Sequence, residues 1–127
     1  MYSAPYQLAG IAVSGGEPEK RQRALRIANQ AAELLNISTR ITTDDLPNDE
    51  AYIGTGYAVA TEACVEAIHL LARTEGIFID PVYSGKAMAG MIDHIRKGMY
   101  QPTDSIVFLH TGGTPALFAH TGDFKFD

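Results

Sequence analysis

The sequence predicts an α/β fold of three layers, in which a mostly parallel sheet is flanked by helices. Short apolar runs typical of buried strands alternate along the chain with segments that have helical apolar spacing. Glycine-containing turns follow several of these runs, as expected where a strand turns into a helix. The length of 127 residues suits one compact unit, so residues 1–127 are expected to form a single domain.

The first half of the chain is expected to hold one strand and one helix. Residues 8–14, LAGIAVS, form an apolar run that ends at two glycines. Residues 17–35 have helical spacing with Pro18 in the first turn, and Asn36 is expected to end this helix. A long connection over residues 38–57 follows, with one short strand near Ile41.

Two further helices and two further strands are expected in the second half. Thr61 is a suitable N-cap for a helix that ends at Gly76, with an apolar stripe of Cys64, Val65, Ile68, Leu71 and Ala72. Residues 77–79 form a short strand, and a third helix runs from Ser84 or Gly85 to Lys97. Residues 105–109 form the last strand, and a short helix capped by Thr114 follows it.

The composition excludes several classes of protein. A formal net charge of -5 argues against a general nucleic-acid binder, whose surface would be basic. No apolar run approaches the length of a membrane span, and the first ten residues do not resemble a signal peptide. The single cysteine, Cys64, fits a reducing cytoplasm and, in the middle of an apolar helix face, a small buried side chain.

Three strand-to-helix corners are candidates for a ligand site: GTGYAVAT, DPVYSGKA and HTGGTP. Ligands of parallel α/β sheets bind beyond the carboxyl ends of the strands. We expect the first N–H groups of each following helix to be free, which suits an anion or a polar heterocycle.

Each corner also has a simpler interpretation. Gly112 and Gly113 allow a close backbone approach and Thr111 offers a hydroxyl, but the same residues suit an ordinary tight turn. Considered alone, Ser84 is better explained as a helix cap, and Tyr83 as a packed ring with its hydroxyl at the rim. GTGY could be an ordinary glycine turn with Tyr57 as a core residue.

Other chemistry-bearing residues give weaker signals. The four histidines lack metal-ligand spacing with acids or cysteines, so no metal is predicted. Lys86 falls in the first turn of a helix, where the macrodipole disfavours a cation, and pairing with Asp80 would offset this. Nothing in the sequence indicates the lowered pKa that a covalent role for this lysine requires.

Together the corners resemble pyridoxal-phosphate (PLP) enzymes of the tryptophan synthase β-like fold. The resemblance is to the carboxyl-terminal part of the branch that holds D-cysteine desulfhydrase and 1-aminocyclopropane-1-carboxylate (ACC) deaminase. It rests on GTGYAVATEACVEAIHLLARTEGIFIDPVYSGKAMAGMI, residues 54–92, and VFLHTGGTPALFAH, residues 107–120. It covers residues 50–120 well and residues 8–35 loosely.

The resemblance implies a role for each corner. Tyr83 would stand near cofactor and substrate and supply a hydroxyl for proton transfer, and Tyr57 would line the substrate side. Ser84 and Thr111 would face the pyridine nitrogen of the cofactor, beside Gly112 and Gly113.

The hydroxyl pair favours one substrate over another. ACC deaminases carry Glu immediately after the tyrosine and Leu before the two glycines, where this chain has Ser84 and Thr111. The resemblance therefore implies β-elimination of D-cysteine to pyruvate, ammonia and hydrogen sulfide, with ACC or L-cysteate as alternative small amino-acid substrates.

Two parts of such an enzyme have no counterpart in this sequence: the Schiff-base lysine segment and the glycine-rich phosphate loop. We therefore expect residues 1–127 to be a fragment of a larger PLP enzyme, inactive alone. Surface left uncovered favours self-association, so a homo-oligomer such as a dimer is expected. A non-catalytic α/β binding module remains the alternative from another class.

Overall fold

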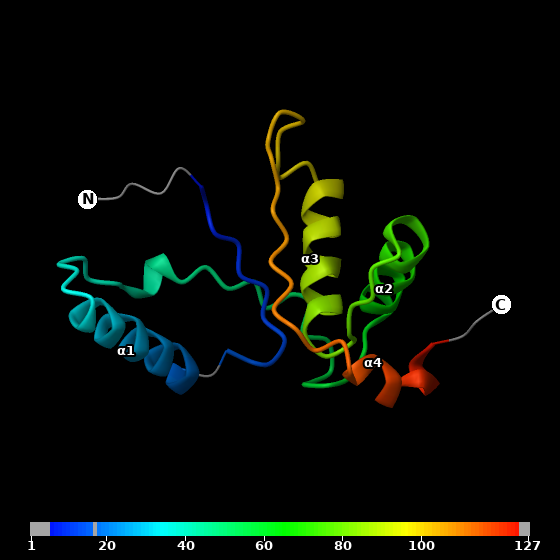
Figure 1. The fold of residues 1–127 in the computed structure, drawn as a ribbon, viewed down its shortest axis with the longest axis horizontal. Helices are drawn as coiled ribbons and strands as arrows, with labels where there is room; N and C mark the ends of the chain where they lie inside the picture. The colour runs from blue at the N-terminus through cyan, green and yellow to red at the C-terminus, as the bar shows by residue number, and fades with distance from the viewer. Residues whose placement is uncertain (1–5, 17, 125–127) are drawn as a thin grey trace. The chain divides into compact units, whose positions relative to one another are not determined.

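The computed structural model describes residues 6–16 and 18–124, which divide into two compact units. Unit 1 comprises residues 1–10 and 16–49, and unit 2 comprises residues 11–15 and 50–127, each within the described limits. The helices in chain order are α1 Pro18–Leu34, η1 Thr43–Asp45, α2 Glu62–Glu75, α3 Ser84–Arg96, α4 Ala116–Ala119 and η2 Thr121–Asp123 (Figure 1).

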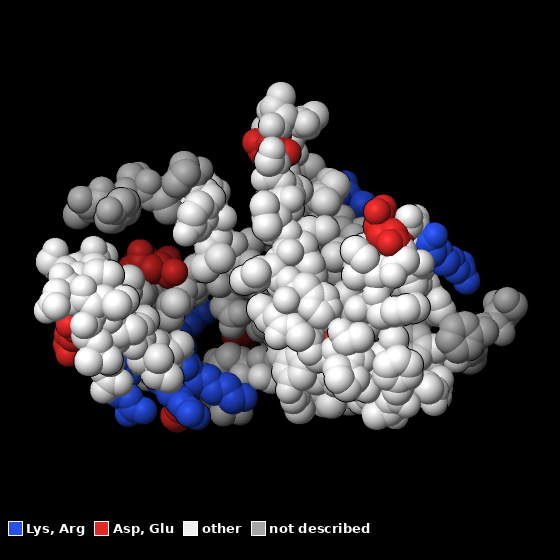
Figure 2. Space-filling model, viewed as in Figure 1, with Lys and Arg blue, Asp and Glu red and all other residues white. Residues whose placement is uncertain are grey.

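Unit 1 consists of α1 and the chain that returns along it. The side-chain amide of Asn29 donates to the backbone oxygens of Leu25 and Ile41 at 3.0 Å, and its oxygen accepts from the Ile41 N–H. This exchange holds residue 41 against the helix. None of the described residues of α1 is buried, and four basic residues gather on it, at positions 20, 21, 23 and 26 (Figure 2).

Unit 2 is built on the packing of α2 against α3, which lie side by side in Figure 1. Its core is a cluster of buried residues: Cys64, Ala67, Ile68, Ile79, Met88, Ala89 and Phe124. A side chain at Gly90 would overlap Ile11, so this glycine lets residue 11 approach α3 closely. The Arg96 guanidinium donates to Glu66 at 2.6 Å across the two helices.

The predicted ends of the helices are close to the observed ones. Thr61 caps α2 by accepting a hydrogen bond from the Cys64 N–H at 3.1 Å, and Gly76 ends it with φ of 66°. Gly98, which follows α3, also has a left-handed backbone with φ of 69°. These positions follow local rules of capping and left-handed glycine, which need no tertiary information.

The predicted parallel sheet is not present in the described residues. Residues 8–14, 77–79 and 105–109 are not paired as strands. Across the described residues, β structure is limited to isolated bridge positions at Ile11 and Asp49. Residues 101–112, drawn in orange in Figure 1, contain no strand. Val107 and Leu109 are 87% and 78% exposed, where a sheet covered by helices would bury them. An extended segment becomes a strand only when a neighbour takes up its N–H and C=O groups, and these segments lack one.

None of the helices in residues 6–16 and 18–124 combines the length and apolar character that a membrane crossing requires.

Candidate functional site

The three predicted corners meet in unit 2. The hydroxyl groups of Tyr57, from the GTGY turn, and Tyr83, at the start of α3, form a hydrogen bond. Their rings stand edge to face with centroids 5.9 Å apart. A Cβ on Gly113, in the HTGG turn, would overlap the carboxylate of Asp80 and come within 2.7 Å of its Cγ. The pairing and the close contact bring parts of residues 54–57, 80–84 and 110–113 together.

Asp80 is the residue that organises the corner before α3. It has no exposed surface, and its carboxylate accepts hydrogen bonds from the N–H groups of Val82, Tyr83 and Ser84 at 2.8 to 2.9 Å. The Ser84 hydroxyl donates to the same carboxylate at 2.5 Å and accepts from the Asp80 N–H at 3.0 Å. Burial raises the pKa of Asp80, but the hydrogen bonds from Ser84, Tyr83 and Val82 hold it below its ordinary value.

This arrangement corrects the expectation that the first N–H groups of each helix are free. In α3 the Ser84 N–H is taken up by the Asp80 carboxylate and the Gly85 N–H by the Asp80 backbone oxygen, and in α2 the Cys64 N–H is taken up by Thr61. These N–H groups are therefore not available to an anion such as a phosphate group.

The predicted cofactor-binding residues differ in how exposed they are to solvent. Ser84 is 3% exposed and its hydroxyl hydrogen is already donated to Asp80. Thr111 and Gly112 are exposed, and Gly112 has open space around it. Gly113 is half-buried against Asp80. Ser84 thus takes part in a local hydrogen-bonding motif with Asp80 and is the first residue of α3, so its interpretation as the helix cap is wrong. The cofactor role of all four residues stays a prediction.

The two tyrosines are the accessible functional groups of the corner. Tyr57 is 54% exposed and Tyr83 is 41% exposed, so neither is a core residue. The hydrogen bond with Tyr83 raises the pKa of Tyr57, and burial and the negative charge of Asp80 act in the same direction. Tyr57 therefore keeps its proton at neutral pH and can act as a hydrogen-bond donor.

Lys86 has no exposed surface. Its ammonium donates to the backbone oxygens of Ile53 at 2.7 Å and Gly56 at 2.9 Å, in place of the pairing with Asp80 that the sequence suggested. Burial lowers its pKa. Burial also raises the pKa of the neighbouring Cys64 thiol to about 11, which agrees with a small structural side chain.

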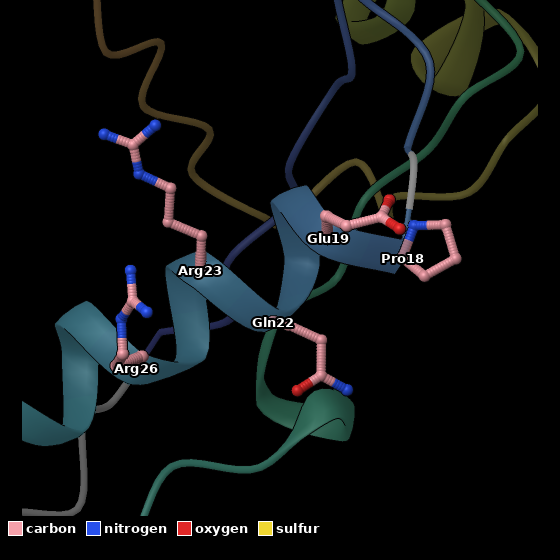
Figure 3. Close-up of a pocket in the computed structure, with 5 residues that line it drawn as sticks. All are labelled: Pro18, Glu19, Gln22, Arg23 and Arg26. Atoms are coloured by element: carbon pink, nitrogen blue, oxygen red, sulfur yellow. The ribbon is translucent and has the colours of Figure 1, made fainter.

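The described residues outside this corner offer no metal site, and their hollow on α1 contains none of the predicted residues. In residues 6–16 and 18–124 no three His, Cys, Asp or Glu side chains are grouped so that they could hold a metal ion. A shallow hollow on α1 is lined by Pro18, Glu19, Gln22, Arg23 and Arg26, and contains none of the predicted residues (Figure 3).

Comparison with known proteins identifies the family of the chain. The profile of the family described as "Pyridoxal-phosphate dependent enzyme" matches residues 5–112. The chain belongs to this family. The prediction of a PLP-dependent enzyme family, and with it the cofactor, is confirmed.

The relatives are ACC deaminases. The chain is 41% identical over 118 residues to the ACC deaminase of Burkholderia multivorans and 40% identical over 119 residues to that of Burkholderia cenocepacia. These alignments cover 93% and 94% of the chain but 35% of each relative, so the chain spans about a third of their length. The crystal structure of an ACC deaminase homologue matches with a TM-score of 0.73 and 33% identity, over 92% of this chain and 34% of that one.

The structural match supports the tryptophan synthase β-like fold at the level of helix arrangement, although strands are almost absent from the described residues. The similarity also reaches further than the sequence suggested, because it covers nearly the whole chain and not mainly residues 50–120. The relatives' name does not favour D-cysteine desulfhydrase over ACC deaminase.

The residues of the corner fit one side of a PLP site. Two exposed phenols and an open glycine backbone suit the substrate side, where protons and carboxylates are handled. The N–H groups of Ser84, Gly85 and Cys64 are already bonded within the chain and do not serve the phosphate group.

Proposed function

We propose that this chain provides the substrate-facing wall of a PLP-dependent enzyme that deaminates a small amino acid, ACC being the first candidate. The observation that carries the proposal is the pair of exposed phenols, Tyr57 and Tyr83, at the point where the corners meet. The name shared by the relatives supports ACC as the substrate.

PLP, when bound, draws negative charge from the α-carbon of an amino acid into its ring. The two tyrosine hydroxyls would donate or accept the protons that move when charge leaves the α-carbon. Either hydroxyl can be the donor in the hydrogen bond between Tyr57 and Tyr83, and the one that accepts keeps its own hydrogen, which it would offer to the substrate. Opening of the ACC ring with addition of water balances as 2-oxobutanoate and ammonia.

A second candidate is β-elimination of D-cysteine. It is favoured by Ser84 and Thr111, because ACC deaminases are expected to carry Glu and Leu at these positions. The hydrogen bond from Ser84 to Asp80 weakens this argument, since that hydroxyl is not free to donate to a ring nitrogen.

A hybrid enzyme tests both candidates. It consists of the Burkholderia multivorans deaminase with its aligned segment replaced by the 118 matching residues of this chain. We expect it to form 2-oxobutanoate and ammonia from ACC. Release of sulfide from D-cysteine without turnover of ACC would select the second candidate.

Absorbance of bound PLP provides the control for folding of the hybrid. If the hybrid binds PLP and turns over neither ACC, D-cysteine nor L-cysteate, the proposed function is wrong. The chain alone, mixed with PLP and the same substrates, is expected to give no product above a cofactor-only control.

A further inference from the structure

Lys86 is buried where an ammonium group is least favoured. It occupies the first turn of α3, whose partial positive charge opposes a cation, and none of its surface is exposed. Burial of a charge costs free energy unless hydrogen bonds compensate it, and the two bonds to Ile53 and Gly56 do so here. An apolar side chain would fill the same space without this cost, so the buried ammonium indicates a role in addition to packing.

The turn that receives these bonds is weakly held by its own backbone. Gly54 and Ala58 both adopt left-handed conformations, with φ of 71° and 59°, and the latter is strained for a residue with a side chain. The backbone hydrogen bonds found in this turn, from Ile53 to Glu50 and from Val59 to Gly56, are long at 3.3 and 3.5 Å. The hydrogen bonds from the Lys86 ammonium are shorter than these backbone bonds, and their donor is charged, which strengthens them.

The turn carries one of the two phenols and α3 carries the other. Tyr57 follows Gly56 directly, and Tyr83 precedes Lys86 by three residues. Asp80 fixes Tyr83 by accepting its backbone N–H at 2.8 Å. The position of Tyr57 relative to Tyr83 therefore depends on the hydrogen bonds between the turn and α3, which Lys86 provides.

We propose that Lys86 is a positioning residue, whose ammonium ties the turn of residues 53–57 to the first turn of α3 and so sets the Tyr57 phenol against that of Tyr83. Its importance for catalysis rests on the proposed function, whereas its effect on the tyrosine pair does not. The same geometry excludes Lys86 as the covalent attachment point of a cofactor, because the amine is buried and engaged with two carbonyl groups.

The hydrogen bonds can be observed in the unaltered chain. With ¹⁵N and ¹³C labelling, we expect NMR couplings from the Lys86 Nζ to the carbonyl carbons of Ile53 and Gly56, together with slow exchange of the ammonium protons. A rapidly exchanging ammonium without these couplings would overturn the proposal. This measurement holds even where a variant fails to fold.

Substitution tests the effect on the tyrosines. In Lys86→Met, the Tyr57 titration, followed by ¹³Cζ NMR, is expected to move down from its raised position to match that of Tyr83→Phe, in which the phenol partner is absent. Lys97→Met removes an exposed lysine just after the same helix and is expected to titrate like the unaltered chain. A Lys86→Met chain that keeps its helices and the original Tyr57 titration would contradict the proposal.

The hybrid enzyme separates this proposal from the proposed function. There Lys86→Met is expected to lower kcat about a hundredfold, with PLP absorbance unchanged, because misplacing a reacting group by about 1 Å costs that much. If the hybrid is inactive, the proposed function fails while the Tyr57 titration still decides the role of Lys86. If kcat is unchanged while the Tyr57 titration moves, the positioning role in catalysis is wrong.

Discussion

Replacement of Asp80 by Asn is expected to destabilise unit 2 more than any other isosteric change at an aspartate. The carboxylate accepts four hydrogen bonds at 2.5 to 2.9 Å, three from backbone N–H groups and one from the Ser84 hydroxyl. An amide has a single acceptor oxygen, so two of the four donors would face its NH₂ group. Hydrogen bonds to a charged group contribute about 1.5–3 kcal/mol each, so the loss of two amounts to about 3–6 kcal/mol. Cheaper burial of the neutral amide offsets part of this, leaving a net loss of about 2–4 kcal/mol.

The assay is urea unfolding followed by far-UV circular dichroism, with Asp104→Asn as the matched control. Asp104 is exposed and accepts one backbone hydrogen bond, from Gln101 at 2.8 Å, so its replacement should cost no more than about 1 kcal/mol. If Asp80→Asn is no more destabilising than Asp104→Asn, the assignment of Asp80 as the organiser of this corner is wrong.

The effect of Asp80 also depends on pH in a defined direction. Its pKa in the folded chain lies below the ordinary value of 3.8, so the folded state favours the ionised carboxylate. The stability that this provides is fully present above that ordinary value and is lost as the pH falls through the lower folded pKa. The difference between the unaltered chain and Asp80→Asn should therefore be constant near neutrality and shrink below about pH 4. A difference that grows on acidification would refute the argument.

Three further predictions concern other parts of unit 2. Gly113→Ala should be more destabilising in urea unfolding than Gly112→Ala, because both have positive φ but only the former would overlap the Asp80 carboxylate; equal losses would contradict this contact. Cys64 should react with thiol reagents at pH 8 only on unfolding, because its pKa is about 11 and it is buried; rapid alkylation of the folded chain would contradict its placement. The chain should self-associate in sedimentation experiments, and Val107→Lys, on the exposed segment, should weaken the association; a monomer at all concentrations would count against this.

Local rules were enough to predict the helices of this chain, whereas the predicted strands are absent from the described residues. Thr61, Gly76 and Gly98 mark helix ends through capping and left-handed backbone, which neighbouring residues determine. A strand depends on hydrogen bonds with segments distant in sequence, and residues 105–109 lack such a neighbour here.

In the candidate site, too, the sequence predicted what neighbouring residues determine and missed what distant residues determine. The corners with Tyr57 and Tyr83 were recognisable because hydroxyls and glycines cluster at the ends of apolar runs. The capping of α3 by Asp80 was not foreseen, although an aspartate that precedes a proline, four residues before the start of a helix, is a signal for such a turn. The two bonds of Lys86 span 30 and 33 residues, a separation at which no local pattern in the sequence could indicate them.

Turnover by the hybrid enzyme carrying Tyr83→Phe would test the role of the phenol pair most directly. Loss of a positioned proton-transfer group lowers kcat by about 10²–10⁴, and we expect a fall in this range with ACC or D-cysteine while bound PLP is retained. Tyr52→Phe is the control, because it removes a phenol that is hydrogen-bonded to Asp93, elsewhere on α3, and should leave kcat nearly unchanged. Equal kcat values for the hybrid with and without the Tyr83 hydroxyl would contradict the catalytic assignment of this corner.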